Sequence, residues 1–210
     1  YAFFSCYSLT SVEIPESVTS IGDGAFTGCK SLTSIVIPNS VTSIGNGAFY
    51  DCTSLINVVI PNSVTSIGFS TFENCTSLKS IVIPDSVTKI ESHAFYGCSS
   101  LESIIIPDSV TSMGERVFYD CFSLTNVVIG NGVKSIDFYA FQNCTSLINV
   151  TIGDSVQIIY CSAFGNCSSL TNIVIPNNVT EIDDKVKIRN VLISVSDKTG
   201  LDEFVKKLVC

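Results

Sequence analysis

The sequence predicts an α/β-type repeat solenoid that is mostly β, with a parallel sheet built from one short strand per 23-residue coil. Three observations support this prediction: a cysteine, a leucine and a phenylalanine each recur every 23 residues. Repeats of about 20 to 50 residues are typical of solenoids, in which each unit buries its apolar side against the next. The three columns are Cys6, Cys29, Cys52, Cys75, Cys98, Cys121, Cys144 and Cys167; Leu9, Leu32, Leu55, Leu78, Leu101, Leu124, Leu147 and Leu170; and Phe3, Phe26, Phe49, Phe72, Phe95, Phe118, Phe141 and Phe164.

Within one coil, the residues after each leucine follow the order of a strand, a turn and a second apolar pair. Ile35 and Ile37 alternate with outward positions, as expected for a strand with one buried face. Pro38 ends the strand because it has no N–H with which to continue a ladder. The turn residues that follow bring Val41 and Ile44 back inward. A single coil cannot bury this apolar side alone, so we expect the coils to stack.

Composition and charge exclude several classes of protein. Apolar residues make up 46% of the 210 residues, which is too many for a disordered chain. No apolar run approaches the roughly 18 residues of a membrane span. Residues 1–184 carry sixteen acidic and five basic side chains, a net charge of −11, whereas residues 185–210 carry +3. The net negative charge of residues 1–184 argues against a nucleic-acid partner, because binding nucleic acid requires clustered lysine and arginine.

The repeat phrase also carries a family resemblance. The pattern L-x-x-I-x-I-P-x-x-V-x-x-I-x-x-x-A-F-x-x-C-x-S resembles the BspA-like (Treponema pallidum type) leucine-rich repeat, and about eight copies, truncated at the N-terminus, fill residues 1–184. Members of that family are surface or secreted proteins implicated in adhesion. The resemblance implies a non-enzymatic protein-interaction module, at the cell surface or secreted, whose partner is a host or matrix protein or a second copy of the chain.

The cysteine column does not predict a metal site or any cofactor. Zinc sites need close cysteine pairs or histidines, whereas each column cysteine stands alone in its repeat and the chain has one histidine. We expect buried free thiols that fill space, although stacking brings some neighbouring sulfurs within reach of a disulfide. Cys161 and Cys210 lie outside the column, and we expect them to be more accessible.

We also predict no catalytic residue. His93 occupies a variable position and has no acidic or nucleophilic column beside it, so we interpret it as an exposed loop histidine.

The outward positions of the predicted strand are the candidate binding residues. The slot between the two buried isoleucines is β-branched in most coils, and the slot just after the leucine varies. An outward apolar stripe indicates an interaction surface, while the alternative is plain β-propensity. The candidate residues are Val36, Ile56, Val59, Lys79, Val82, Glu102, Ile105, Val128 and Ile148. A second candidate surface, on the opposite loops, comprises the aromatic residues Tyr50, Phe69, Tyr96, Tyr119 and Tyr139, which we expect to be exposed.

Residues 185–210 do not repeat, and we treat them as a separate C-terminal segment. Residues 191–195 read as a strand and residues 201–209 as a helix. The stretch between them resembles the N-terminal start of AICAR transformylase/IMP cyclohydrolase. That resemblance implies a candidate phosphate-binding loop at a helix N-terminus. Its residues are Ser194, Ser196, Lys198, Thr199 and Gly200.

Two further hypotheses therefore stand beside the interaction module. One is a repeat scaffold fused to a fragment of a purine-nucleotide-binding enzyme, and the other is a purely structural spacer. The segment itself is either a foreign junction or a cap that covers the last coil, as solenoids require for solubility.

Overall fold

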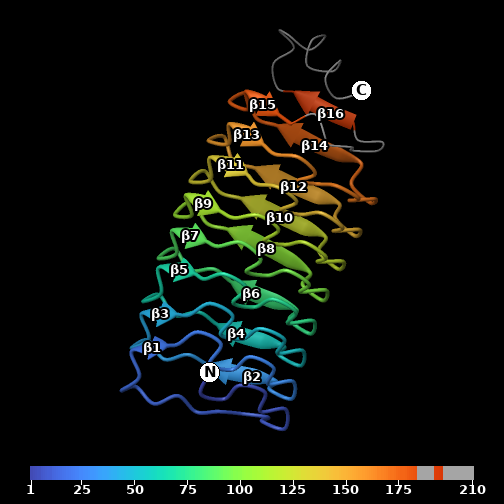
Figure 1. Ribbon diagram of the computed structural model, residues 1–210. Coiled ribbons are helices and arrows are strands. Elements are labelled where there is room, and N and C mark those ends of the chain that lie inside the picture. The colour runs from blue at the N-terminus through green and yellow to red at the C-terminus, as the bar shows by residue number, and fades with distance from the viewer. Residues whose placement is uncertain (184–191, 196–210) are drawn as a thin grey trace.

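The coils stack on one another into a solenoid, with the N-terminus in the first coil and β16 beside the last (Figure 1). The computed structural model describes residues 1–183 and 192–195. Within these ranges the secondary structure consists of strands, short bridges and turns, with no helix. The prediction of a mostly β, parallel solenoid is confirmed. The predicted helix over 201–209 lies outside the described residues.

The first sheet layer contains the strands predicted after each leucine. Every pairing in it is parallel and joins a strand to the corresponding strand of a neighbouring coil. Ile35 therefore lies opposite Val58, and Val58 lies opposite Ile81. β16 continues this layer by pairing with β14, where Ile173 lies opposite Ile193. Its strands are β2 (Ser34–Val36), β4 (Asn57–Val59), β6 (Ser80–Val82), β8 (Ser103–Ile106), β10 (Asn126–Ile129), β12 (Asn149–Ile152), β14 (Asn172–Ile175) and β16 (Leu192–Val195).

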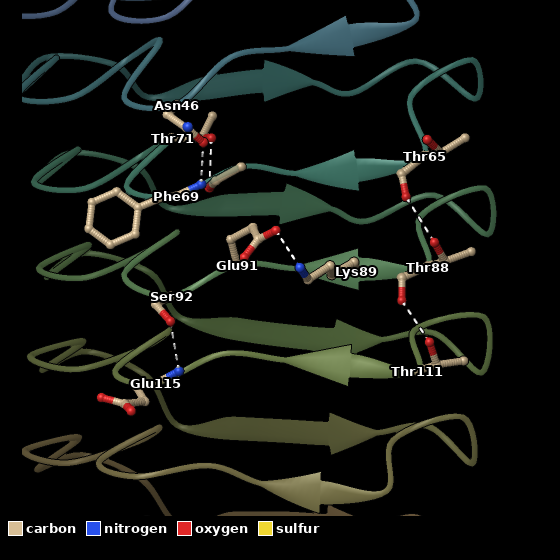
Figure 2. Close-up of polar contacts among 11 residues, drawn as sticks. Asn46, Thr65, Phe69, Thr71, Thr88, Lys89, Glu91, Ser92, Thr111 and Glu115 are labelled. Carbon is tan, nitrogen blue, oxygen red and sulfur yellow. Dashed lines mark hydrogen bonds and ion pairs between the residues drawn. The ribbon is translucent and has the colours of Figure 1, made fainter.

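A second layer of two-residue strands was not predicted. Each strand follows the turn after the proline position, and Figure 2 shows how threonines beside it repeat from coil to coil. The Thr88 hydroxyl donates to the Thr65 carbonyl oxygen at 3.3 Å, and Thr111 donates to Thr88 at 3.2 Å. Two residues are too short for a period-two signal in the sequence. The strands are β1 (Ser20–Ile21), β3 (Ser43–Ile44), β5 (Ser66–Ile67), β7 (Lys89–Ile90), β9 (Ser112–Met113), β11 (Ser135–Ile136), β13 (Ile158–Ile159) and β15 (Glu181–Ile182).

The loop that returns from the second layer to the first is also hydrogen-bonded between coils. The Phe49 N–H donates to the Thr71 carbonyl at 2.9 Å, and the Phe95 N–H donates to the Val117 carbonyl at 2.9 Å. Buried backbone groups need such partners. The ladder therefore allows the loop to lie against the core without forming a regular strand.

A ladder of phenylalanine rings fills the core on the loop side. From Phe3 to Phe164, neighbouring rings stack with centroids 5.1 to 5.5 Å apart and interplanar angles of 1° to 9°. Ile35 and Ile37 are buried, as predicted, at 3% and 4% exposure. Each coil thus buries its apolar side against copies of the same residues, which explains why the columns recur so faithfully.

Each loop passes twice through the left-handed backbone region. One of these positions has φ values of about 60° to 70° at Asn74, Gly97 and Asn143, among others. Glycine and asparagine are the residues that adopt this conformation at low cost. The choice of residue in this column therefore follows from the backbone.

Substitution of Gly97, whose φ is +70°, should show how much stability depends on a residue that tolerates the left-handed backbone conformation. We expect Gly97→Val to lower the free energy of unfolding by about 2 kcal/mol, because a β-branched residue fits the left-handed region poorly. Gly97→Asn should lose less than about 1 kcal/mol, since asparagine holds the equivalent position in other coils. Guanidinium unfolding followed by circular dichroism measures both. Equal losses would contradict the explanation.

Candidate protein-binding face

The outward column of the first layer forms a continuous exposed stripe, which we call the valine column. The register places Val59 opposite Val36 and Val82, and in the next group of strands it places Val128 opposite Ile105 and Thr151. Val82 is 78% exposed and Ile105 is 65% exposed. These side chains project from the sheet because neighbours in sequence point to opposite faces. The valine column is consequently apolar from Val36 to Val128.

The residues just after each leucine form a second exposed column, which we call the variable column and which includes Ile56, Lys79, Glu102 and Ile148. It is also in register from coil to coil. Backbone N–H groups connect successive coils, from Lys79 to the Ile56 carbonyl at 3.3 Å and from Glu102 to the Lys79 carbonyl at 3.1 Å. Ile56, Lys79, Glu102 and Ile148 are all exposed. The structure therefore brings all nine candidate residues to one exposed face, where Lys79 and Glu102 add one charge of each sign.

A third column on this face was missed by the sequence analysis. It consists of serine or asparagine at the first position of each strand of this layer from β2 to β14, and these residues are all exposed. In the later coils the Asn149 side-chain amide donates to the Asn126 side-chain oxygen at 2.7 Å, and Asn126 donates to the Thr125 hydroxyl at 2.7 Å. The period-two rule could have identified this column, because it shares the parity of the valine column. The column supplies donors and acceptors beside the apolar stripe.

The cysteine column is structural, as predicted. From residues 1 to 183 the cysteines are free thiols, and from Cys29 to Cys167 the column is buried. Each buried Sγ donates to the carbonyl of a phenylalanine in the preceding coil, as in the 3.2 Å contact from Cys98 to Phe72. Burial raises the pKa of Cys98 well above its ordinary value, so this thiol stays protonated at neutral pH.

Three expectations about accessibility require correction, and the first concerns Cys6, which begins the cysteine column but is exposed. Cys161, expected to be accessible, is 5% exposed. Its column is polar or aromatic in the earlier coils, and only the packed loop shows that the Cys161 side chain is covered. Cys210 lies outside the described residues. His93 is half-buried between Phe69 and Tyr96, with ring centroids at 5.3 and 5.6 Å, and is not an exposed loop histidine.

The second candidate surface is only partly exposed. Phe69 is 48% exposed, whereas Tyr50, Tyr96, Tyr119 and Tyr139 are half-buried. Tyr96 and Tyr119 cover one another across neighbouring coils, which the sequence of a single coil cannot show.

The candidate phosphate-binding loop cannot be placed. Ser196, Lys198, Thr199 and Gly200 lie outside the described residues. For Ser194, in β16, only the backbone is described, and it pairs with Val174 in β14. Among residues 1–183 and 192–195, the structure has no apolar helix of membrane-spanning length.

A parallel solenoid with an L-x-x-I-x-I strand in each coil defines the class of leucine-rich repeat proteins. Six copies of the BspA type leucine-rich repeat region match this chain, over residues 1–114 and 65–190. The chain belongs to the BspA-type leucine-rich repeat family.

Solved structures agree with this assignment. The Treponema pallidum leucine-rich repeat protein is similar with 31% identity and a TM-score of 0.73, covering 77% of this chain and 78% of that one. A leucine-rich cell surface protein of Faecalibacterium prausnitzii has 24% identity and a TM-score of 0.51, covering 95% and 83%. A leucine-rich repeat protein of Eubacterium ventriosum has 24% identity and a TM-score of 0.54, covering 86% and 76%. No curated protein shows significant sequence similarity to the chain.

Proposed function

We propose that the protein is a non-enzymatic interaction module that binds another protein through the valine column and the variable column. The observation that carries the proposal is the exposure of β-branched side chains that lie in register, from Val36 to Val82 and again from Ile105 to Thr151. Contiguous apolar surface of this kind marks protein-interaction sites, because its exposure to water is unfavourable.

The composition of the face supports the same conclusion. An apolar centre with a polar rim is the usual anatomy of a protein interface. Here the serine and asparagine column supplies hydrogen-bonding groups, and Lys79 and Glu102 supply charges that change from coil to coil. Because the scaffold is constant and these positions vary, we infer that the variable column sets specificity.

The role that we propose is adhesion at the cell surface or after secretion. The family resemblance favours a host or matrix protein as partner, and the flat stripe equally suits a second copy of the chain. A leucine-rich repeat family assignment fits a binding scaffold rather than a catalyst.

Charge introduced into the stripe should abolish binding. We expect the double substitution Val82→Asp and Ile105→Asp to weaken partner binding at least tenfold, because two carboxylates would lose their water at the centre of the interface. Surface plasmon resonance against immobilised extracellular-matrix proteins, with sedimentation velocity for self-association, provides the measurement.

The matched control is Ser66→Asp with Ser112→Asp, which adds the same two charges to the second sheet layer in β5 and β9. It should leave binding unchanged, and circular dichroism should be the same for all variants. Undiminished binding by the double variant would refute the proposed face. Absence of binding by the unsubstituted protein, together with a monomeric state, would favour the structural spacer.

A further inference from the structure

We propose that the loop edge carries a second binding surface, which takes the lysine or arginine side chains of a basic protein segment. This surface, called the aromatic edge, comprises Tyr50, Phe69, His93, Tyr96 and Tyr119. Figure 2 shows Phe69 projecting from the loop edge, on the side away from the threonine-bearing turns. The aromatic edge is therefore separate from the valine column, and the inference does not depend on the function proposed for that column.

The rings of the aromatic edge are continuous across three coils. Phe69 contacts His93 with centroids 5.3 Å apart, and His93 contacts Tyr96 at 5.6 Å. Tyr96 then stacks on Tyr119 at 4.9 Å with an interplanar angle of 2°. The backbone supports this arrangement, since the Phe69 N–H donates to the Asn46 side-chain oxygen at 2.9 Å (Figure 2). The rings are thus held in fixed positions at the surface.

The surface between these rings is hollowed and acidic. Tyr50, Phe69, Glu73 and His93 line one open groove of about 550 Å³. Glu73 occupies the column position between Tyr50 and Tyr96, and its carboxylate accepts a hydrogen bond from the Ser70 hydroxyl at 2.5 Å. Among the described residues, neither Glu73 nor Asp120 belongs to an ion pair.

Carboxylates also lie near Tyr96, beside the residues that line the groove. Burial raises the pKa of Tyr96, and the carboxylates of Asp120 and Glu73 raise it further. The imidazole Nδ1 of His93 is buried without a hydrogen-bond partner among the described residues. The aromatic edge therefore combines ring faces with the carboxylate of Glu73 in the groove and the carboxylate of Asp120 near Tyr96.

The chain already binds its own cations with this combination of groups. The Arg116 guanidinium lies 4.6 Å from the centre of the Tyr139 ring, and its Nη1 lies 3.5 Å from the Glu115 carboxylate. Cations are attracted to the negative face of an aromatic ring and to carboxylates at the same time. Arg116 shows the arrangement that a partner's arginine would adopt.

A second pair repeats the arrangement near the N-terminus. Lys30 lies 6.0 Å from the centre of the Tyr7 ring and 3.1 Å from the Asp51 carboxylate. Glu73 with Tyr50 and Tyr96 presents the same groups with no cation of the described chain bound to them. The net charge of −11 over residues 1–184 further favours a basic partner through long-range attraction.

The test measures fluorescence anisotropy of a labelled peptide of alternating glycine and arginine, titrated with the full chain at low ionic strength. We expect saturable binding that Tyr96→Ala and Glu73→Gln each weaken about tenfold. Tyr96→Phe should stay within about twofold of the unsubstituted protein, because phenylalanine keeps a ring face for the cation. Thermal unfolding of each variant verifies that the fold is retained.

Asp85→Asn is the control for nonspecific attraction, since Asp85 is an exposed carboxylate on the proline turn at the opposite edge. Binding by this variant should stay within about twofold of the unsubstituted protein. An equal loss in Asp85→Asn and Glu73→Gln would overturn the proposal, because it would show attraction to the acidic body alone. The proposal also fails if the peptide does not bind, if Tyr96→Phe loses as much as Tyr96→Ala, or if neutral maltohexaose displaces the peptide.

Discussion

Raising the pH from about 9 to about 10.5 is expected to unfold the protein, because the buried cysteine column resists ionisation only in the folded state. Burial raises the pKa of Cys52 and Cys167 to about 12. It raises the pKa of Cys75, Cys98, Cys121 and Cys144 well above the ordinary value of 9.0. The unfolded chain therefore releases these protons at a lower pH than the folded chain does.

The direction in which pH changes the free energy of unfolding follows from the number of thiol protons that the folded and unfolded states bind. Below pH 9 both states hold their thiol protons, and the stabilisation is fully present. Above pH 9 the unfolded state binds fewer protons, so the free energy of unfolding falls by about 1.4 kcal/mol per pH unit for each buried thiol. Six such thiols together lose about 8 kcal/mol per unit, which is comparable with the whole stability of a typical domain. Guanidinium midpoints measured from pH 8 to pH 10.5 test this expectation.

Cys98→Ser is the matched control for this titration. Serine retains a donor for the Phe72 carbonyl, which Cys98 Sγ reaches at 3.2 Å, and its hydroxyl does not ionise in this range. We expect the pH dependence to become shallower by about 1.4 kcal/mol per unit, and by twice as much when Cys121→Ser is added. A slope unchanged in both variants would show that the thiols are not responsible.

Truncation of one ring in the phenylalanine ladder should give the next largest effect. Phe95 is fully buried and stacks between Phe72 and Phe118, at 5.5 and 5.2 Å. We expect Phe95→Ala to lower the free energy of unfolding by about 3 to 5 kcal/mol, because it leaves a cavity that both neighbouring coils line. Chemical denaturation followed by circular dichroism measures the loss.

Phe122→Ala provides the comparison within the same region of the solenoid, since Phe122 is 45% exposed. That substitution should change stability by no more than about 0.5 kcal/mol. Similar losses for the two phenylalanines would mean that the stacked ladder is not a principal source of stability.

The repeat itself is the reason that so much of the fold is predictable. In a stack of near-identical coils, a position buried in one coil meets the same position in the next, so that stacked members of a column share the same burial. The burial of Ile35 and Ile37, the outward Val36 and the burial of Cys52 all follow from this regularity. The nine candidate residues were placed on one face for the same reason, and their role in binding remains a prediction.

Features that depend on contacts between coils were not predictable from one coil. The two-residue strand at Ser43–Ile44 exists because it pairs with Ser20–Ile21 of the preceding coil, and not because its own sequence alternates. Interactions between neighbouring coils also half-bury Tyr96 against Tyr119 and set His93 between two rings. Cys161 is covered by its packed loop, although its position outside the column indicated the opposite.

The sequence alone therefore determined the solenoid, its period of 23 residues and the inward or outward direction of each strand position. It could do so because period-two alternation and the recurring columns are properties of each coil. The tertiary structure alone decided the second sheet layer, the hydrogen-bonded loops and the aromatic edge. The physical reason is that their hydrogen bonds and ring contacts form only between neighbouring coils, where residues about 23 positions apart meet.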